Sequence, residues 1–206
     1  MNVLLTDILV CPRCGTDFGL ILLSHETAQR RVREGELGCP NCRDRFPIRD
    51  GFGDLRAPPR HALEEETLPS LPPRAGLAAA AGLGVAEGPG VFVFLGGVGR
   101  VAGEVARAVS GIEVAAVSAA AAGWPAEPGV SRMVSRPGIP IRSGRVRGVA
   151  MDAYLWGRWG EEALRVLVPR SRLVLFGSPQ EGTPWKGHEG VRVLLEDESV
   201  TVLTSG

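Results

Sequence analysis

Residues 9–43 read LVCPRCGTDFGLILLSHETAQRRVREGELGCPNCR and contain all four cysteines of this 206-residue chain. The cysteines form two C-P-x-C pairs, Cys11 with Cys14 and Cys39 with Cys42, and 24 residues separate the pairs. Each pair can offer two thiolates at the corners of a tetrahedron, so the two pairs together supply the ligands of one zinc ion. Such clustering is typical of metal binding rather than of a disulfide framework. We therefore predict a small zinc ribbon held by these four cysteines.

The predicted ribbon is too small to fold on apolar burial alone, so the metal must contribute much of its stability. Four sulfur ligands leave no open coordination position, which makes the predicted zinc structural rather than catalytic. The alternative is four unrelated buried cysteines. The repeated spacing, with a proline in each pair, favours the zinc site.

Two segments around the cysteines resemble a known family. They are LTDILVCPRCG (residues 5–15) and GELGCPNCRDRFPIRDGFGDL (residues 35–55). The pattern resembles the zinc-ribbon activator subunits of methyltransferases that act on tRNA and translation factors, and it extends from residue 2 to about residue 57. Five residues after the second pair fall on the family pattern: Phe46, Pro47, Ile48, Asp50 and Gly51. The resemblance implies a module that docks on a protein partner and carries no catalytic residues.

A proline-rich segment follows the predicted ribbon. Residues 57–75 read APPRHALEEETLPSLPPRA, with five prolines and an acidic run at 64–66. Such a composition favours an extended, semi-rigid connector. We predict a ribbon over 1–57, a linker over 58–75 that separates two cores, and a second domain over 76–206.

The second domain alternates apolar strand-like runs with helical patterns. The strand-like runs are VFVFL (91–95), IEVAAV (112–117), RGVAM (147–151) and RLVLF (172–176), and helical patterns lie at 100–109 and 161–168. Continuous apolar strands separated by helices indicate a parallel sheet covered on both faces. The final run VRVLLEDESVTVLTS (191–205) predicts an antiparallel hairpin at the sheet edge.

Residues 77–204 resemble a class I S-adenosylmethionine-dependent methyltransferase, whose Rossmann-like sheet ends in a reversed strand. The predicted fold class is therefore α/β, a small zinc ribbon followed by a Rossmann-like methyltransferase-type sheet with a terminal antiparallel hairpin.

The cofactor site that this resemblance implies is incomplete. Gly97 and Gly99 hold the second and third positions of the family's glycine-rich loop, where backbone approaches the cofactor. Leu95 replaces the first glycine, Val93 replaces an acidic residue, and Ser118 stands where a carboxylate would accept the ribose hydroxyls. A hydrogen bond to a charged group contributes about 1.5–3 kcal/mol, so losing both carboxylates should weaken cofactor binding by two or more orders of magnitude.

Two hypotheses of function follow. In the first, the chain is a non-catalytic accessory or scaffold subunit with no catalytic residue, and it binds and stabilises a larger protein assembly. In the second, it is an active S-adenosylmethionine-dependent methyltransferase with an atypical pocket, in which Gly97, Gly99 and Ser118 contact the cofactor. The missing carboxylates favour the first. A group that follows the fourth predicted strand fits substrate contact and aromatic packing equally well; it comprises Asp152, Tyr154, Trp156 and Trp159.

Charge and hydropathy bear on partners and location. The formal net charge is zero, but residues 130–172 hold nine arginines against three acidic residues. This region could meet an anionic surface, or it could reflect a chain that uses arginine in place of lysine. No segment has the ~18 consecutive apolar residues of a membrane span, and the beginning does not resemble a secretory signal. We expect a cytoplasmic protein, free or peripheral to a membrane complex.

Overall fold

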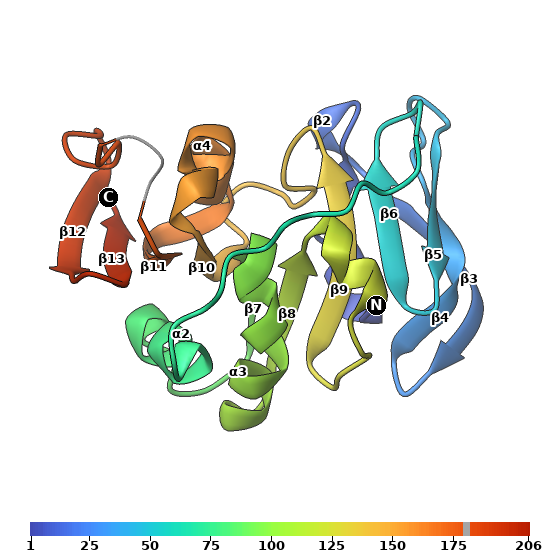
Figure 1. The fold of residues 1–206 in the computed structure, drawn as a ribbon. Helices are drawn as coiled ribbons and strands as arrows, with labels where there is room; N and C mark the ends of the chain where they lie inside the picture. Colours follow the sequence, from blue (N-terminus) through green and yellow to red (C-terminus); the bar gives the residue numbers. More distant parts are fainter. Residues whose placement is uncertain (179–181) are drawn as a thin grey trace.

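One large sheet runs through the whole molecule in the computed structural model, which describes residues 1–178 and 182–206 (Figure 1). Within these residues the sheet has 11 strands in the order β12-β13-β11-β10-β7-β8-β9-β6-β5-β4-β3. Strands β1 and β2 form a separate antiparallel pair. The order shows that strands from the two predicted domains are neighbours in one sheet.

The elements divide at the proline-rich segment. Before it lie α1 (Val3–Thr6), β1 (Val10–Cys11), β2 (Gly15–Gly19), β3 (Ile21–Ala28), β4 (Arg31–Gly38), β5 (Arg45–Arg49) and β6 (Phe52–Arg56). After it lie α2 (Ala75–Leu83), β7 (Gly90–Leu95), η1 (Gly96–Val101), α3 (Ala102–Ala108), β8 (Ile112–Val117), η2 (Ala119–Gly123), β9 (Val130–Arg136), β10 (Val146–Asp152), η3 (Ala153–Leu155), α4 (Trp156–Val166), β11 (Leu167–Phe176), β12 (Val191–Glu196) and β13 (Val200–Ser205).

The second half of the chain has a Rossmann-like topology. Strands β9, β8, β7, β10 and β11 are parallel and lie in that spatial order, which is the 3-2-1-4-5 order of a doubly wound sheet. Strand β13 pairs antiparallel with β11, and β12 pairs antiparallel with β13 at the edge. The parallel core and the reversed terminal hairpin confirm the predicted fold class.

Side chains of the central strands alternate between two cores, as the period of two requires. Phe92 and Phe94 of β7 face a cluster with α2 and α3, whereas Val93 and Leu95 face the opposite side. On that opposite side α4 shares the cover with the beginning of the chain, whose Leu5, Leu9 and Cys11 pack into the same cluster. An amino-terminal segment therefore covers part of the sheet where a helix was expected.

The ribbon continues the sheet of the second domain through a parallel pair of strands. Residues 52–56 of β6 pair in register with residues 132–136 of β9. β5, β4 and β3 then extend the sheet antiparallel (Figure 1). This pairing satisfies the backbone groups of β9 that would otherwise form an open edge.

A charged network also joins the ribbon to the second domain, in addition to the backbone pairing of β6 with β9. The Glu113 carboxylate of β8 accepts hydrogen bonds from Arg31 Nη2 at 2.8 Å and from Ser131 Oγ at 2.6 Å. It also accepts one from Asn2 Nδ2 at 2.9 Å. Arg31 further donates to the Val130 carbonyl. The ribbon and the second domain therefore share a half-buried ion pair in addition to the sheet.

The prediction of two separate cores is wrong. One apolar cluster contains Leu37, Phe46 and Ile48 of the ribbon together with Val117 and Met133 of the second domain. The linker separates the two modules in the sequence but not in space. Strand β6 pairs with β9, and this pairing places the ribbon against the second domain. The boundaries at residues 57 and 75 remain predictions.

The strands predicted from apolar runs are confirmed as β7, β8, β10 and β11, and the terminal hairpin is confirmed as β12 and β13. Strand β9, which pairs with β6 of the ribbon, was not predicted from the sequence. In residues 1–178 and 182–206, no helix combines the length and the hydropathy needed to cross a membrane.

Candidate functional site

The four predicted zinc ligands lie together at the tip of the ribbon. Their Sγ atoms are all within 4.8 Å of one another. Cys11 Sγ lies 3.7 Å from Cys42 Sγ, and Cys14 Sγ lies 3.9 Å from Cys39 Sγ. Sulfurs at the corners of a tetrahedron with zinc–sulfur bonds of about 2.3 Å are about 3.8 Å apart. The cluster therefore has the dimensions of a tetrahedral zinc site and could hold that ion.

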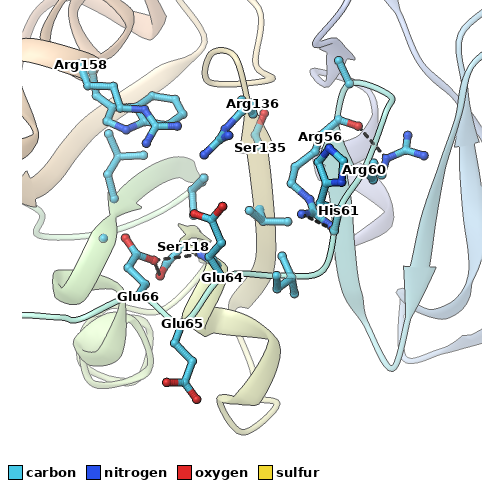
Figure 2. Close-up of a pocket in the computed structure, with 18 of the residues that line it drawn as sticks. Arg56, Arg60, His61, Glu64, Glu65, Glu66, Ser118, Ser135, Arg136 and Arg158 are labelled. Carbon is cyan, nitrogen blue, oxygen red and sulfur yellow. Dashed lines mark hydrogen bonds between the residues drawn. The ribbon is translucent and has the colours of Figure 1, made fainter.

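A second site lies at the carboxyl edge of the parallel strands, where ligands bind in open α/β sheets. A cavity of about 250 Å³ opens there between the ends of β7, β8 and β9, the start of α4 and the linker (Figure 2). Its lining includes the apolar side chains of Leu95, Val117 and Trp159 and the charged side chains of Arg136 and Arg158. Ligand pockets usually measure about 300–1,000 Å³, so this space is small.

The glycines after β7 pack against the protein itself. Gly96 has φ +77°, and a Cβ there would lie 2.5 Å from Asp152 Oδ2. A Cβ on Gly99 would lie 2.6 Å from the Trp124 ring. The turn therefore needs glycine for its own backbone and packing. The roles of Gly97 and Gly99 as cofactor contacts remain predictions of the methyltransferase hypothesis.

The end of β8 is occupied by a carboxylate from the linker. Glu66 Oε2 accepts hydrogen bonds from Ser118 Oγ at 2.5 Å and from the Ala119 backbone N–H at 3.0 Å (Figure 2). Ser118 is the position at which the resemblance calls for an acidic residue, and Glu66 supplies one from 52 residues away in sequence. Sequence reasoning missed Glu66; the acidic run at 64–66 was the available signal.

The linker also covers the glycine turn. A Cβ built on Gly97 would lie 3.4 Å from Leu68 Cβ and 3.4 Å from Pro69 Cδ. Arg100 donates to the Pro69 carbonyl and, at 3.2 Å, to the Gly97 carbonyl. S-adenosylmethionine would need this backbone surface and the end of β8, and the linker already contacts both. The residues as arranged do not fit that cofactor.

Asp152, at the end of β10, is a buried carboxyl group in this region. It is 1% exposed, and its Oδ2 accepts the Gly97 N–H at 2.5 Å. Its Oδ1 is buried and meets no hydrogen-bond partner among the described residues. Burial raises the pKa of Asp152 to about 6, against the opposing effects of the Gly97 N–H and the Arg100 charge. Strongly shifted carboxyl groups are frequent at functional sites, although Asp152 lies beneath the glycine turn rather than in the lining of the cavity.

We expect Asp152→Asn to stabilise the protein more at pH 8 than at pH 5.5. The folded pKa lies above the unfolded value, so the stability from the protonated form is present at low pH and is lost as the pH rises through about 6. The advantage of the asparagine variant should therefore grow by about 1 kcal/mol over this range. Chemical denaturation of both proteins at the two pH values measures it. A difference that does not depend on pH would contradict the pKa shift.

The aromatic residues after β10 belong to the core. Trp156 and Trp159 are 8% and 6% exposed, and Trp156 lies edge-on to Trp185 with ring centroids 5.6 Å apart. This favours packing for Trp156, whereas Trp159 both packs in the core and lines the cavity. Tyr154 is half-buried, and burial raises its pKa to about 12.

Several arginines of the 130–172 region are used inside the molecule. Arg132 donates to the Asp50 carbonyl at 2.6 Å, Arg147 donates to the Pro89 carbonyl at 2.6 Å, and Arg165 pairs with Glu162 at 2.7 Å. Outside this region, Arg31 of the ribbon also has an internal partner, since it pairs with Glu113. An anionic partner for the remaining arginines is still a prediction.

The fold and the two sites define a four-cysteine ribbon joined to a Rossmann-like sheet of the methyltransferase type. The family model described as Trm112p-like protein matches residues 2–51. The amino-terminal module is therefore a Trm112p-like domain, as the cysteine pairs and the residues around them indicated. Among curated proteins, none matches this chain.

Solved structures with a similar arrangement include methyltransferases. An S-adenosylmethionine-dependent O-methyltransferase from Thermotoga maritima is 14% identical, with a TM-score of 0.48, over 82% of this chain and 77% of that one. A predicted O-methyltransferase from Agrobacterium tumefaciens is 19% identical, with a TM-score of 0.45, over 64% and 79%. The fold assignment rests on the order and direction of the strands.

Proposed function

We propose that this chain is a non-catalytic accessory or scaffold subunit that binds and stabilises a larger protein assembly. One observation carries the proposal. The chain's own linker takes contacts at the carboxyl edge that a cofactor would need, through Glu66 on Ser118 and through Leu68 and Pro69 on Gly97. A cofactor would have to displace these contacts before it could bind.

Pairing within the chain supports the same proposal. A Trm112p-like module is expected to dock on a methyltransferase-type partner, and here β6 pairs with β9 of the same chain. Fusion makes this docking intramolecular, with a high effective concentration. The ribbon thus stabilises its own second domain, and the four cysteines, with zinc bound, would stabilise the ribbon.

The test is purification of the tagged protein from its native cells under mild conditions. We expect a protein partner in stoichiometric amount, retained at physiological salt. A protein that elutes alone as a monomer, together with methyl transfer from S-adenosylmethionine, would contradict an accessory role.

A second candidate is an active S-adenosylmethionine-dependent methyltransferase, and Asp152 favours it. A buried carboxyl group with an unpartnered oxygen in the part of the chain described here costs stability, and such a cost is typical of residues kept for function. This candidate requires the linker to leave the cleft. Gly97, Gly99 and Ser118 would then be the cofactor contacts.

A further inference from the structure

Residues 61–69, which we name the strap, cross the carboxyl edge of the sheet between β6 and α2 (Figures 1 and 2). Near its beginning, Arg56 Nη1 donates to the His61 carbonyl at 2.9 Å. At its end, Arg100 donates to the Pro69 carbonyl. Between these two points Glu66 fastens the strap to the end of β8.

Most residues of the strap are exposed to solvent. Glu66 and Leu68 are half-buried, whereas the other seven residues are exposed. Figure 2 shows the carboxylate of Glu66 directed at Ser118 and that of the neighbouring Glu65 directed away from it. The strap is therefore held at isolated points, and the middle point is a single carboxylate.

Glu66 and Leu68 also contact the groups at the ends of β7 and β8 that a ligand in this cleft would need. Glu66 takes the Ser118 hydroxyl and the Ala119 N–H, the donors at the end of β8. Leu68 and Pro69 lie on the bare backbone of Gly97 at the end of β7. In open α/β sheets ligands bind where the strand order reverses. Here the strand order reverses between β7 and β10, and Gly97 follows β7 at that point. The strap thus lies where a ligand of an open α/β sheet would bind.

We propose that the strap is a detachable cover over the ends of β7 and β8, fastened by Glu66, and that it detaches as a unit while the sheet stays folded. This inference rests on the proposed function, because both are argued from the same contacts of the strap. Detachment breaks a few contacts of an irregular, exposed segment and leaves both apolar clusters intact, so it is a local opening of low cost compared with unfolding.

Hydrogen exchange of the full-length, zinc-loaded protein tests this proposal. The Ala119 amide, which donates to Glu66, reports on the strap directly. Glu66→Ala removes the fastening, and we expect exchange at residues 118–120 and 96–100 to become at least about tenfold faster, since a hydrogen bond to a charged group contributes about 1.5–3 kcal/mol. Exchange within β7, β8 and β10 should stay unchanged. Glu66→Gln, which keeps one acceptor oxygen, should give an intermediate rate.

Glu65→Ala is the matched control, because it removes a neighbouring carboxylate that points away from Ser118 (Figure 2). Its exchange should equal that of the wild-type protein. Unchanged exchange at Ala119 in Glu66→Ala would overturn the proposal, as would faster exchange throughout β7 and β8, because the strap would then be part of the sheet's own stability. Titration with S-adenosylmethionine tests the proposed function separately: binding by the wild-type protein would contradict that function whatever the exchange rate at Ala119.

Discussion

Cys39→Ser is expected to unfold the ribbon and to expose β9 and β8 with it. Cys39 is one of four clustered thiols, and structural zinc sites contribute several kcal/mol to folding. Without the ribbon, β9 loses its partner strand β6, and Met133 and Val117 lose the ribbon side chains of their shared cluster. The damage should therefore cross the linker into the second domain.

The measurement combines metal analysis with hydrogen exchange. Wild-type protein prepared without chelator should contain about one zinc per chain, and the variant much less. In the variant, amides of β8 and β9 should lose protection together with those of β4 to β6. If β8 and β9 keep wild-type protection while the ribbon unfolds, the two modules are independent. The shared core would then not contribute to the stability of the second domain.

Glu113→Ala should lower the free energy of unfolding by about 2–4 kcal/mol, because Glu113 is itself buried and its removal leaves the charge of the half-buried Arg31 uncompensated. The Glu113 side chain is 10% exposed and that of Arg31 is 25% exposed. Asn2 and Ser131 would lose the same acceptor. Chemical denaturation with a double-mutant cycle against Arg31→Ala should give a coupling energy above about 1 kcal/mol.

Glu26→Ala provides the control, since Glu26 pairs with Arg33 at 3.8 Å with both side chains more than half exposed. An exposed pair contributes about 0–1 kcal/mol, so this change should have a small effect. Equal effects of the Glu113 and Glu26 substitutions would contradict the role assigned to the network between the ribbon and the second domain.

The elements that the sequence revealed share one property, a local pattern. The cysteine pairs give a fixed spacing, and β7, β8, β10 and β11 are apolar runs whose two faces are both buried. Strand β9 has no such run, because VSRMVSR places Ser131, Arg132 and Ser135 in buried positions. These side chains have partners far away in the sequence: Ser131 donates to Glu113, Arg132 to the Asp50 carbonyl, and Ser135 to the Leu55 carbonyl. A buried polar strand cannot be recognised before its partners are known.

The same limit explains the linker. Its prolines predicted an extended conformation. They do not determine where the segment lies on the protein, because that depends on its contacts with distant residues. Glu66 meets Ser118 across 52 residues of chain, and nothing local distinguishes Glu66 from Glu64 or Glu65. The role of Ser118 in a cofactor site remains a prediction; the structure adds that a carboxylate from the strap contacts it.

Calorimetric titration of the full-length, zinc-loaded protein with S-adenosylmethionine tests the central claim most directly, namely that the chain's own strap closes the cleft of a non-catalytic subunit. We expect no saturable binding, because Glu66, Leu68 and Pro69 occupy the contacts that the ligand needs. A dissociation constant tighter than ~10 μM, corresponding to about −7 kcal/mol, would contradict the account and make the methyltransferase hypothesis the primary one.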